Sequence, residues 1–134
     1  MNTEILLIED NKLISFIIKK LTEEFNKDAK VIEFEDGEKA LDYILKLDSS
    51  ICNLPNLILL DINLPILNGW QLLERLESVK HPVLSVPIFI TSSSEDLNNV
   101  EKARNCAYIN GYLKKPIMHD KYFSLLECYL DASV

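Results

Sequence analysis

One short segment constrains the fold more than any other: an apolar run that ends in a carboxylate. Residues 57–60 are all leucine or isoleucine, and Asp61 follows them directly. An apolar run without polar alternation is typical of a strand that is buried on both faces of a sheet. A carboxylate at the end of such a strand needs a partner or a chemical role, because an unpaired buried charge is strongly destabilising. The segment therefore predicts a central strand and a candidate site at its end.

Further apolar runs have the same character, and segments with helical spacing separate them. The expected strands are residues 5–8, 31–34, 57–60, 86–90 and 111–113. The intervening segments carry apolar residues three or four positions apart, which is the spacing of an amphipathic helix. These positions are Ile14, Ile17, Ile18, Leu21 and Phe25; Ala40, Leu41, Ile44 and Leu47; Leu72, Leu73 and Leu76; and Phe123, Leu126 and Leu130. Five strand–helix units predict an α/β domain with a parallel sheet and helices on both faces.

Particular residues mark where the helices begin. Asn11 opens the first helix, and a turn at residues 36–37 precedes the second. The third starts at about Gly69, and the final helix spans residues 122–130. Ser93 and Asp96 have the spacing of a capping box, so we expect the fourth helix to start there.

Length and charge narrow the class of protein. The 134 residues suit a single domain, residues 1–134, with no room for a separate output domain. A net charge of −7 would repel a phosphate backbone and anionic lipids, so we expect no direct nucleic-acid or membrane binding. The N-terminus lacks the basic start and long apolar region of a signal peptide. The odd number and wide spacing of Cys52, Cys106 and Cys128 predict free thiols in a reducing cytoplasm.

Polar residues follow four of the expected strands. Glu9 and Asp10 follow the first strand, Asp61 the third, Thr91 the fourth, and Lys115 the fifth. Ligands of open parallel sheets bind outside the carboxyl ends of the strands, so these side chains can converge on one site. Taken singly, each has a simpler interpretation, such as a helix-start acid, a strand threonine or a surface lysine. Asp61 is the hardest to explain in that way, and the combination favours a site.

The chemistry of the expected cluster is specific. Carboxylates held close together repel one another, unless a positive charge lies among them. An oxygen-only ligand set without histidine or cysteine suits a hard cation such as Mg²⁺, or Mn²⁺ in its place. A carboxylate beside such an ion can attack phosphorus and become an aspartyl phosphate. A lysine and a hydroxyl can stabilise the charge on the transferred group.

The sequence resembles the response-regulator receiver family of two-component signalling, and the match spans essentially the whole chain. The segments that carry the resemblance are residues 8–11, 59–65 with Asn68 and Gly69, 87–92, and 111–116. The resemblance implies a flavodoxin-like, doubly wound sheet of five parallel strands in the order 2-1-3-4-5 with five helices.

The resemblance also implies roles for individual residues. Asp61 would be the phosphoacceptor, and Thr91 and Lys115 would contact the phosphoryl group. The metal ligands would be Asp10, Asp61 and the backbone carbonyl of Asn63, with Glu9 acting through water. Tyr112 would turn inward with Thr91 as a switch residue, although it could also be a partly exposed strand tyrosine. Lys115 is preferred to its neighbour because it precedes Pro116, in a bond that is often cis in the family.

These roles predict a phosphorylation switch and not an enzyme. A sensor histidine kinase or a phosphotransfer protein would phosphorylate Asp61, and a downstream protein would read the altered face. The chain resembles stand-alone receivers that work with phytochrome-like and other bacterial sensor kinases, and since some of those dimerise, homodimerisation stays open. Three departures from the usual pattern are Glu9 as the first acid, Ser92 in place of a small residue, and Cys106 before the fifth strand. The segment 80–85 is also longer than in compact receivers.

Other functions remain as alternatives. The chain could be a phosphorelay intermediate or a receiver-like binding module that works without phosphorylation. An aspartyl-phosphatase would need an acid two residues after its nucleophile, where this chain has Asn63. A flavin-binding domain of the same topology would need a phosphate-cradling loop after the first strand, where this chain has Glu9 and Asp10.

Overall fold

The sheet has the predicted topology. The computed structural model describes residues 3–47, 54–93 and 97–130. Five parallel strands pair in the order β2-β1-β3-β4-β5, which confirms the flavodoxin-like expectation. The strands are β1 (Glu4–Ile8), β2 (Lys30–Phe34), β3 (Leu57–Asp61), β4 (Ile88–Ser92) and β5 (Gly111–Lys114). The helices are α1 (Lys12–Phe25), α2 (Gly37–Leu45), α3 (Gly69–Ser78), α4 (Leu97–Asn105) and α5 (His119–Tyr129), with a short 3-10 helix η2 (Pro82–Ser85).

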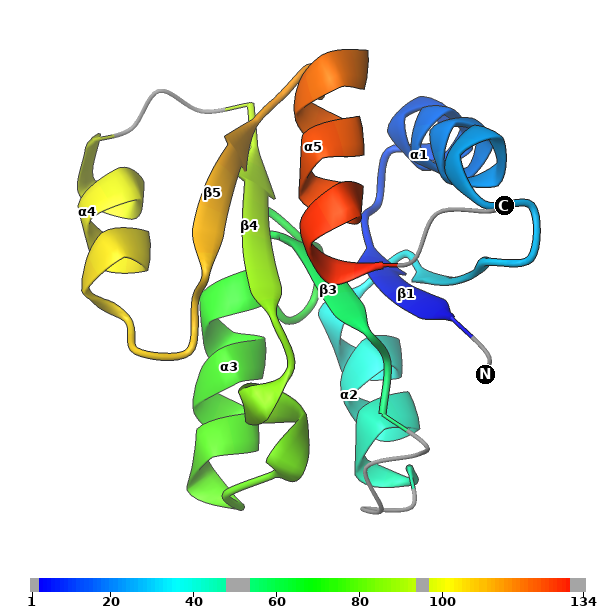
Figure 1. Ribbon diagram of the computed structural model, residues 1–134. Helices are drawn as coiled ribbons and strands as arrows, with labels where there is room; N and C mark the ends of the chain where they lie inside the picture. Colours follow the sequence, from blue (N-terminus) through cyan, green and yellow to red (C-terminus); the bar gives the residue numbers. More distant parts are fainter. Residues whose placement is uncertain (1–2, 48–53, 94–96, 131–134) are drawn as a thin grey trace.

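Helices cover both faces of the sheet and enclose two cores. Helices α1 and α5 lie together on one face, and α2 and α3 lie on the other, with α4 beside β5 (Figure 1). Successive side chains of a strand point to opposite faces. Thus Ile5 and Leu7 of β1 join the core under α1 and α5, whereas Leu6 and Ile8 join the core under α2, α3 and α4.

Side-chain caps fix where three helices begin, and two of them follow strands that lead to the site. The Asn11 side chain accepts hydrogen bonds from the backbone N–H groups of Leu13 and Ile14 at the start of α1. Asp36 caps α2, and Asn68 forms a reciprocal capping box with Gln71 at the start of α3. The capping box expected for the fourth helix includes Asp96, which lies outside the described residues.

Strand β4 begins two residues later than predicted. It spans Ile88–Ser92 and not residues 86–90, because the segment before it forms η2 and Val86 caps that turn. Pro87 has no N–H to donate, and it contributes only its carbonyl, which accepts a 2.9 Å hydrogen bond from Ile58. The consequence is that Thr91 and Ser92 belong to the strand itself.

Two helices also differ from expectation in which residues they bury. Helix α5 begins at His119, before the predicted residue 122, and Tyr122 and Leu125 are buried where Phe123 is only half-buried. On α1, Ile17 has the spacing of the apolar stripe but is exposed, as are Leu13 and Phe16. The helical period therefore identified the helices but not every side chain that faces the core.

Two further findings bear on the class of protein. Across the described ranges 3–47, 54–93 and 97–130, no helix combines the length and apolar character needed to cross a membrane. Cys106 and Cys128 are free thiols, and Cys52 lies outside the described residues.

A buried hydrogen bond joins the two helices of the α1–α5 face. The hydroxyls of Thr22 and Tyr122 lie 2.7 Å apart, and both residues are buried. Thr22 donates its own proton to the Ile18 carbonyl at 2.7 Å, so the Tyr122 hydroxyl must be the donor between the two side chains. The contact fixes α5 against α1 through groups that have no access to water.

This assignment of donor and acceptor predicts unequal costs for two conservative substitutions. Thr22→Val leaves the buried Tyr122 donor unpaired and should lower the free energy of unfolding by about 1–3 kcal/mol. Tyr122→Phe removes that donor and leaves only a spare acceptor on Thr22, so its cost should be smaller, about 1 kcal/mol. Urea denaturation of both variants and of the double variant tests the assignment. Additive costs would contradict it, because the double variant should cost less than the sum.

Candidate functional site

The predicted site residues meet at the carboxyl ends of β1, β3 and β5. Since Asp61 pairs with Thr91 in the register of β3 and β4, the end of β4 lies beside them. An open cleft of about 650 Å³ lies over these strand ends. Its lining residues are Glu9, Asp10, Asn11, Ile14, Asp61, Asn63, Ser93, Lys115 and Pro116.

Three carboxylates gather in this cleft. One carboxylate oxygen from each of Glu9, Asp10 and Asp61 lies within 4.8 Å of the other two. Glu9 and Asp61 are buried, whereas Asp10 is exposed at the rim. Like charges at such separations repel one another, so the arrangement needs positive charge nearby.

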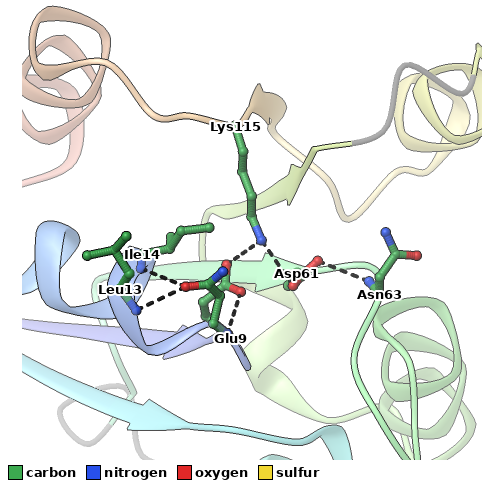
Figure 2. A network of polar contacts seen from close by, with 7 residues as sticks. Glu9, Leu13, Ile14, Asp61, Asn63 and Lys115 are labelled. Carbon is green, nitrogen blue, oxygen red and sulfur yellow. Dashed lines mark hydrogen bonds and ion pairs between the residues drawn. The ribbon is translucent and has the colours of Figure 1, made fainter.

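Lys115, the residue that directly follows β5, supplies positive charge to this cluster. Its side chain is only 8% exposed, and Figure 2 shows it reaching between Glu9 and Asp61. The Nζ atom lies 2.5 Å from Glu9 Oε1 as an ion pair and donates a 3.1 Å hydrogen bond to Asp61 Oδ2. The Lys115–Pro116 peptide bond is cis, as the sequence resemblance implied.

The pKa values of this pair reflect burial and mutual attraction. Burial raises the pKa of the Glu9 carboxyl to about 7, although its contacts with Lys115 and with the Asn11 backbone oppose the rise. Burial by itself would lower the pKa of the Lys115 ammonium, but Glu9 and Asp61 outweigh it and keep that pKa above its usual value. One ammonium therefore contacts two of the three clustered carboxylates, and the site remains short of positive charge.

The loop after β3 holds the Asp61 carboxylate in place. The Asn63 N–H donates a 3.0 Å hydrogen bond to Asp61 Oδ1, so both carboxylate oxygens have a donor (Figure 2).

Helix α3 begins directly against the loop: a Cβ atom on Gly69 would lie 2.7 Å from the Asp61 carbonyl oxygen. Between them, Ile66 adopts a positive φ of 68° although it is not glycine, and the Leu67 N–H bonds back to the Pro65 carbonyl at 2.7 Å. Such a tight turn is a strained conformation for a β-branched residue.

The Thr91 hydroxyl is buried and lacks a partner. Thr91 is 1% exposed, and its Oγ1 atom makes no hydrogen bond with any part of the chain that the structure describes. Buried hydroxyls are normally paired, so an orphaned one beside a site points to a ligand. Ser92, the next residue, is also fully buried.

The donor set fits a divalent metal together with an oxyanion. Two buried carboxylates and one exposed carboxylate form an oxygen-only group with excess negative charge, which suits Mg²⁺ or Mn²⁺. Asp10 and Asp61, with the Asn63 carbonyl, are the residues that would hold the ion. The unpaired Thr91 hydroxyl and the Lys115 ammonium would face the oxyanion.

Not every predicted residue lies in the cleft. Tyr112 is half-buried on β5 and lines a separate cavity of about 330 Å³ between α4 and β5, with Val100 and Ala103 among its neighbours. Glu9 does line the cleft, where it pairs with Lys115, and its contact with a metal ion through water stays a prediction.

Sequence reasoning missed one contributor to the site. The Asn11 N–H donates a 3.1 Å hydrogen bond to Glu9 Oε2, while its side chain caps α1. An asparagine directly before a helical period was a signal for the cap, but not for the contact with Glu9.

Comparison with known proteins agrees with this geometry. Residues 5–127 match the family described as the response regulator receiver domain. Among curated relatives, response regulator Rcp1 of Synechocystis sp. is 29% identical over 83% of this chain and 75% of its own. Sporulation initiation phosphotransferase F of Bacillus subtilis is 24% identical over 97% of this chain and 95% of its own.

Solved structures share the fold. The structure of the phosphorylated cyanobacterial phytochrome response regulator RcpA superposes with a TM-score of 0.81 at 24% identity, covering 100% of this chain and 98% of its own. The Mn²⁺-bound form of Rcp1 gives a TM-score of 0.75 at 24% identity, covering 98% of this chain and 99% of its own.

The carboxylate cluster predicts a gain in stability when Mg²⁺ is added. An ion that binds the folded chain at 100 times its dissociation constant adds about 2.7 kcal/mol to the free energy of unfolding. Thermal melts with and without MgCl₂ should therefore show a higher Tm with the ion. Asp10→Asn should abolish the increase while changing the metal-free stability little, since Asp10 is exposed.

Asp42→Asn is the matched control, because Asp42 is an exposed acid on α2 outside the cluster. It should keep the full response to Mg²⁺. An equal response from the Asp10 variant and the control would show that the ion acts nonspecifically and not at this site.

Proposed function

The chain belongs to the response regulator receiver domain family, and from that membership we propose that Asp61 accepts a phosphoryl group in two-component signalling. The observation that carries the proposal is the environment of Asp61. Asp61 is a buried carboxylate that lines the cleft and is held by Lys115 and Asn63. The Thr91 hydroxyl lies on the adjacent strand and has no partner among the described residues.

The reaction is a phosphoryl transfer. An Asp61 carboxylate oxygen attacks the phosphorus of a phosphohistidine, the new O–P bond forms as the N–P bond breaks, and the imidazole nitrogen keeps the electron pair. A bound divalent ion would supply charge neutralisation of the phosphoryl oxygens. Lys115 stabilises the same charge, and the Asn63 N–H orients the attacking carboxylate.

Thr91 provides the link from chemistry to signal. A phosphoryl group on Asp61 offers oxygens to the unpaired Thr91 hydroxyl, on the adjacent strand. Movement of Thr91 toward the phosphoryl group would free space for Tyr112 beside α4. We propose this pair as the switch that alters the surface of α4 and β5.

The proposed donor is a histidine kinase or a phosphotransfer protein. Leu13, Phe16 and Ile17 form an exposed apolar surface on α1, whose first residues follow Glu9 and Asp10 at the cleft. Exposed apolar side chains that adjoin a reactive site suit a protein partner. A face of this spacing fits a helix of a partner that presents its phosphohistidine to Asp61.

Two details favour signalling or relay over enzymatic turnover. Asn63 stands where an aspartyl-phosphatase needs an acid. The relative from Bacillus subtilis is described as a phosphotransferase, which supports a phosphorelay intermediate as the second candidate.

Intact mass spectrometry after incubation with acetyl phosphate and Mg²⁺ tests the proposed phosphoacceptor. The chain should gain about 80 Da, the mass of one phosphoryl group. The gain should disappear in Asp61→Asn and with EDTA, and persist in Asp42→Asn. If the wild-type protein shows no adduct, even at short times, the proposed phosphoacceptor role of Asp61 would be contradicted.

The unpaired hydroxyl predicts opposite effects of Thr91→Val on stability and phosphorylation. Removing a buried unsatisfied group should raise the free energy of unfolding of the unmodified protein by about 1 kcal/mol. The same change removes a hydrogen bond to the phosphoryl group, so phosphorylation by acetyl phosphate should slow. Thr91→Ser keeps the hydroxyl and is the control. A loss of stability in Thr91→Val would mean that Thr91 has a structural role instead.

A further inference from the structure

Helix α4 is held to the rest of the molecule by few buried contacts. Of the α4 side chains that the structure describes, Ala103 alone is buried. A cavity of about 330 Å³ lies between α4 and β5. Elements with little buried apolar surface are the first to move in a folded protein. Individual polar contacts therefore matter for the attachment of α4.

Trp70 makes two such contacts. It lies in the first turn of α3, and its Nε1–H donates a 3.2 Å hydrogen bond to Asn99 Oδ1 on α4. One turn further along α4, the Lys102 ammonium lies 4.8 Å from the centre of the Trp70 ring, within range of a cation–π interaction. The Trp70 side chain thus contacts α4 in two ways, through its indole N–H and through the face of its ring.

Trp70 connects α3 and α4, and both helices follow strands that end at the site. Trp70 directly follows Gly69, whose backbone abuts the Asp61 carbonyl. Helix α4 follows β4, which ends at Thr91 and Ser92. If Thr91 moves to satisfy its hydroxyl, β4's end and the start of α4 shift relative to α3. Hydrogen bonds weaken steeply with distance and angle, so this shift would strain the Trp70–Asn99 bond.

We propose that Trp70 is a positioning residue that latches α4, through Asn99 and Lys102, in the arrangement in which the Thr91 hydroxyl has no partner among the described residues. The inference rests on the proposed function of Asp61. Contacts made in only one of two arrangements shift the equilibrium between them. Phosphorylation must therefore break the latch, and weakening the latch must favour binding of a phosphoryl group at Asp61.

Beryllofluoride, a noncovalent mimic of a phosphoryl group on a carboxylate, allows an equilibrium test in the presence of Mg²⁺. Titration calorimetry of the full chain measures its affinity. Asn99→Ala and Lys102→Gln should each bind it more tightly, on the order of fivefold for the loss of one hydrogen bond. Asn105→Ala, at an exposed position on the same helix, should match wild type.

Tryptophan fluorescence reports on the latch itself, because Trp70 is the one tryptophan of the sequence. Saturating beryllofluoride should shift its emission to longer wavelength, and Asn99→Ala should show part of that shift without the mimic. Unchanged emission at saturation, or variants that bind no more tightly than wild type, would overturn the latch while leaving Asp61's role intact. A wild-type chain that binds no beryllofluoride would instead overturn the proposed function, and the latch with it.

Discussion

The ion-paired Lys115 ammonium is the interaction on which the arrangement of the site depends. It contacts Glu9 and Asp61, the two buried acids at the ends of β1 and β3, from a position just beyond β5. Without this cation the two acids would repel each other in a medium that screens charge poorly. The contact therefore ties three strand ends together and leaves the remaining negative charge directed at the open cleft.

The two sides of the sheet differ in how firmly their helices are attached. On one side, Tyr122 lies fully buried and its hydroxyl is paired with Thr22, so α5 and α1 are joined through the core. On the other, α4 contributes one described buried side chain and makes polar contacts with Trp70. This contrast suits a domain in which one face keeps the strands in register while the other changes position.

The sequence predicted the topology and the convergence of Glu9, Asp10, Asp61 and Lys115, because both depend on local patterns. Apolar runs identified the strands, and polar residues at their ends identified Glu9, Asp61, Thr91 and Lys115. The predicted start of β4, at residue 86, was wrong because residues 82–85 form the short helix η2. The apolar pattern of a strand does not reveal such a turn. Contacts between distant segments were equally inaccessible: nothing local shows that Trp70 meets Asn99, or that the Thr91 hydroxyl is left unpaired.

The sheet also separates the interior into two cores, and no described buried side chain belongs to both. Leu6 and Ile8 serve one core while their neighbours Ile5 and Leu7 serve the other. Residues without common neighbours tend to have independent effects on stability. Mutations under α1 and α5 should therefore show little epistasis with mutations under α2 and α3. Substitutions that accumulate on one side can then change that surface and its choice of partner. The packing that supports the other side is preserved.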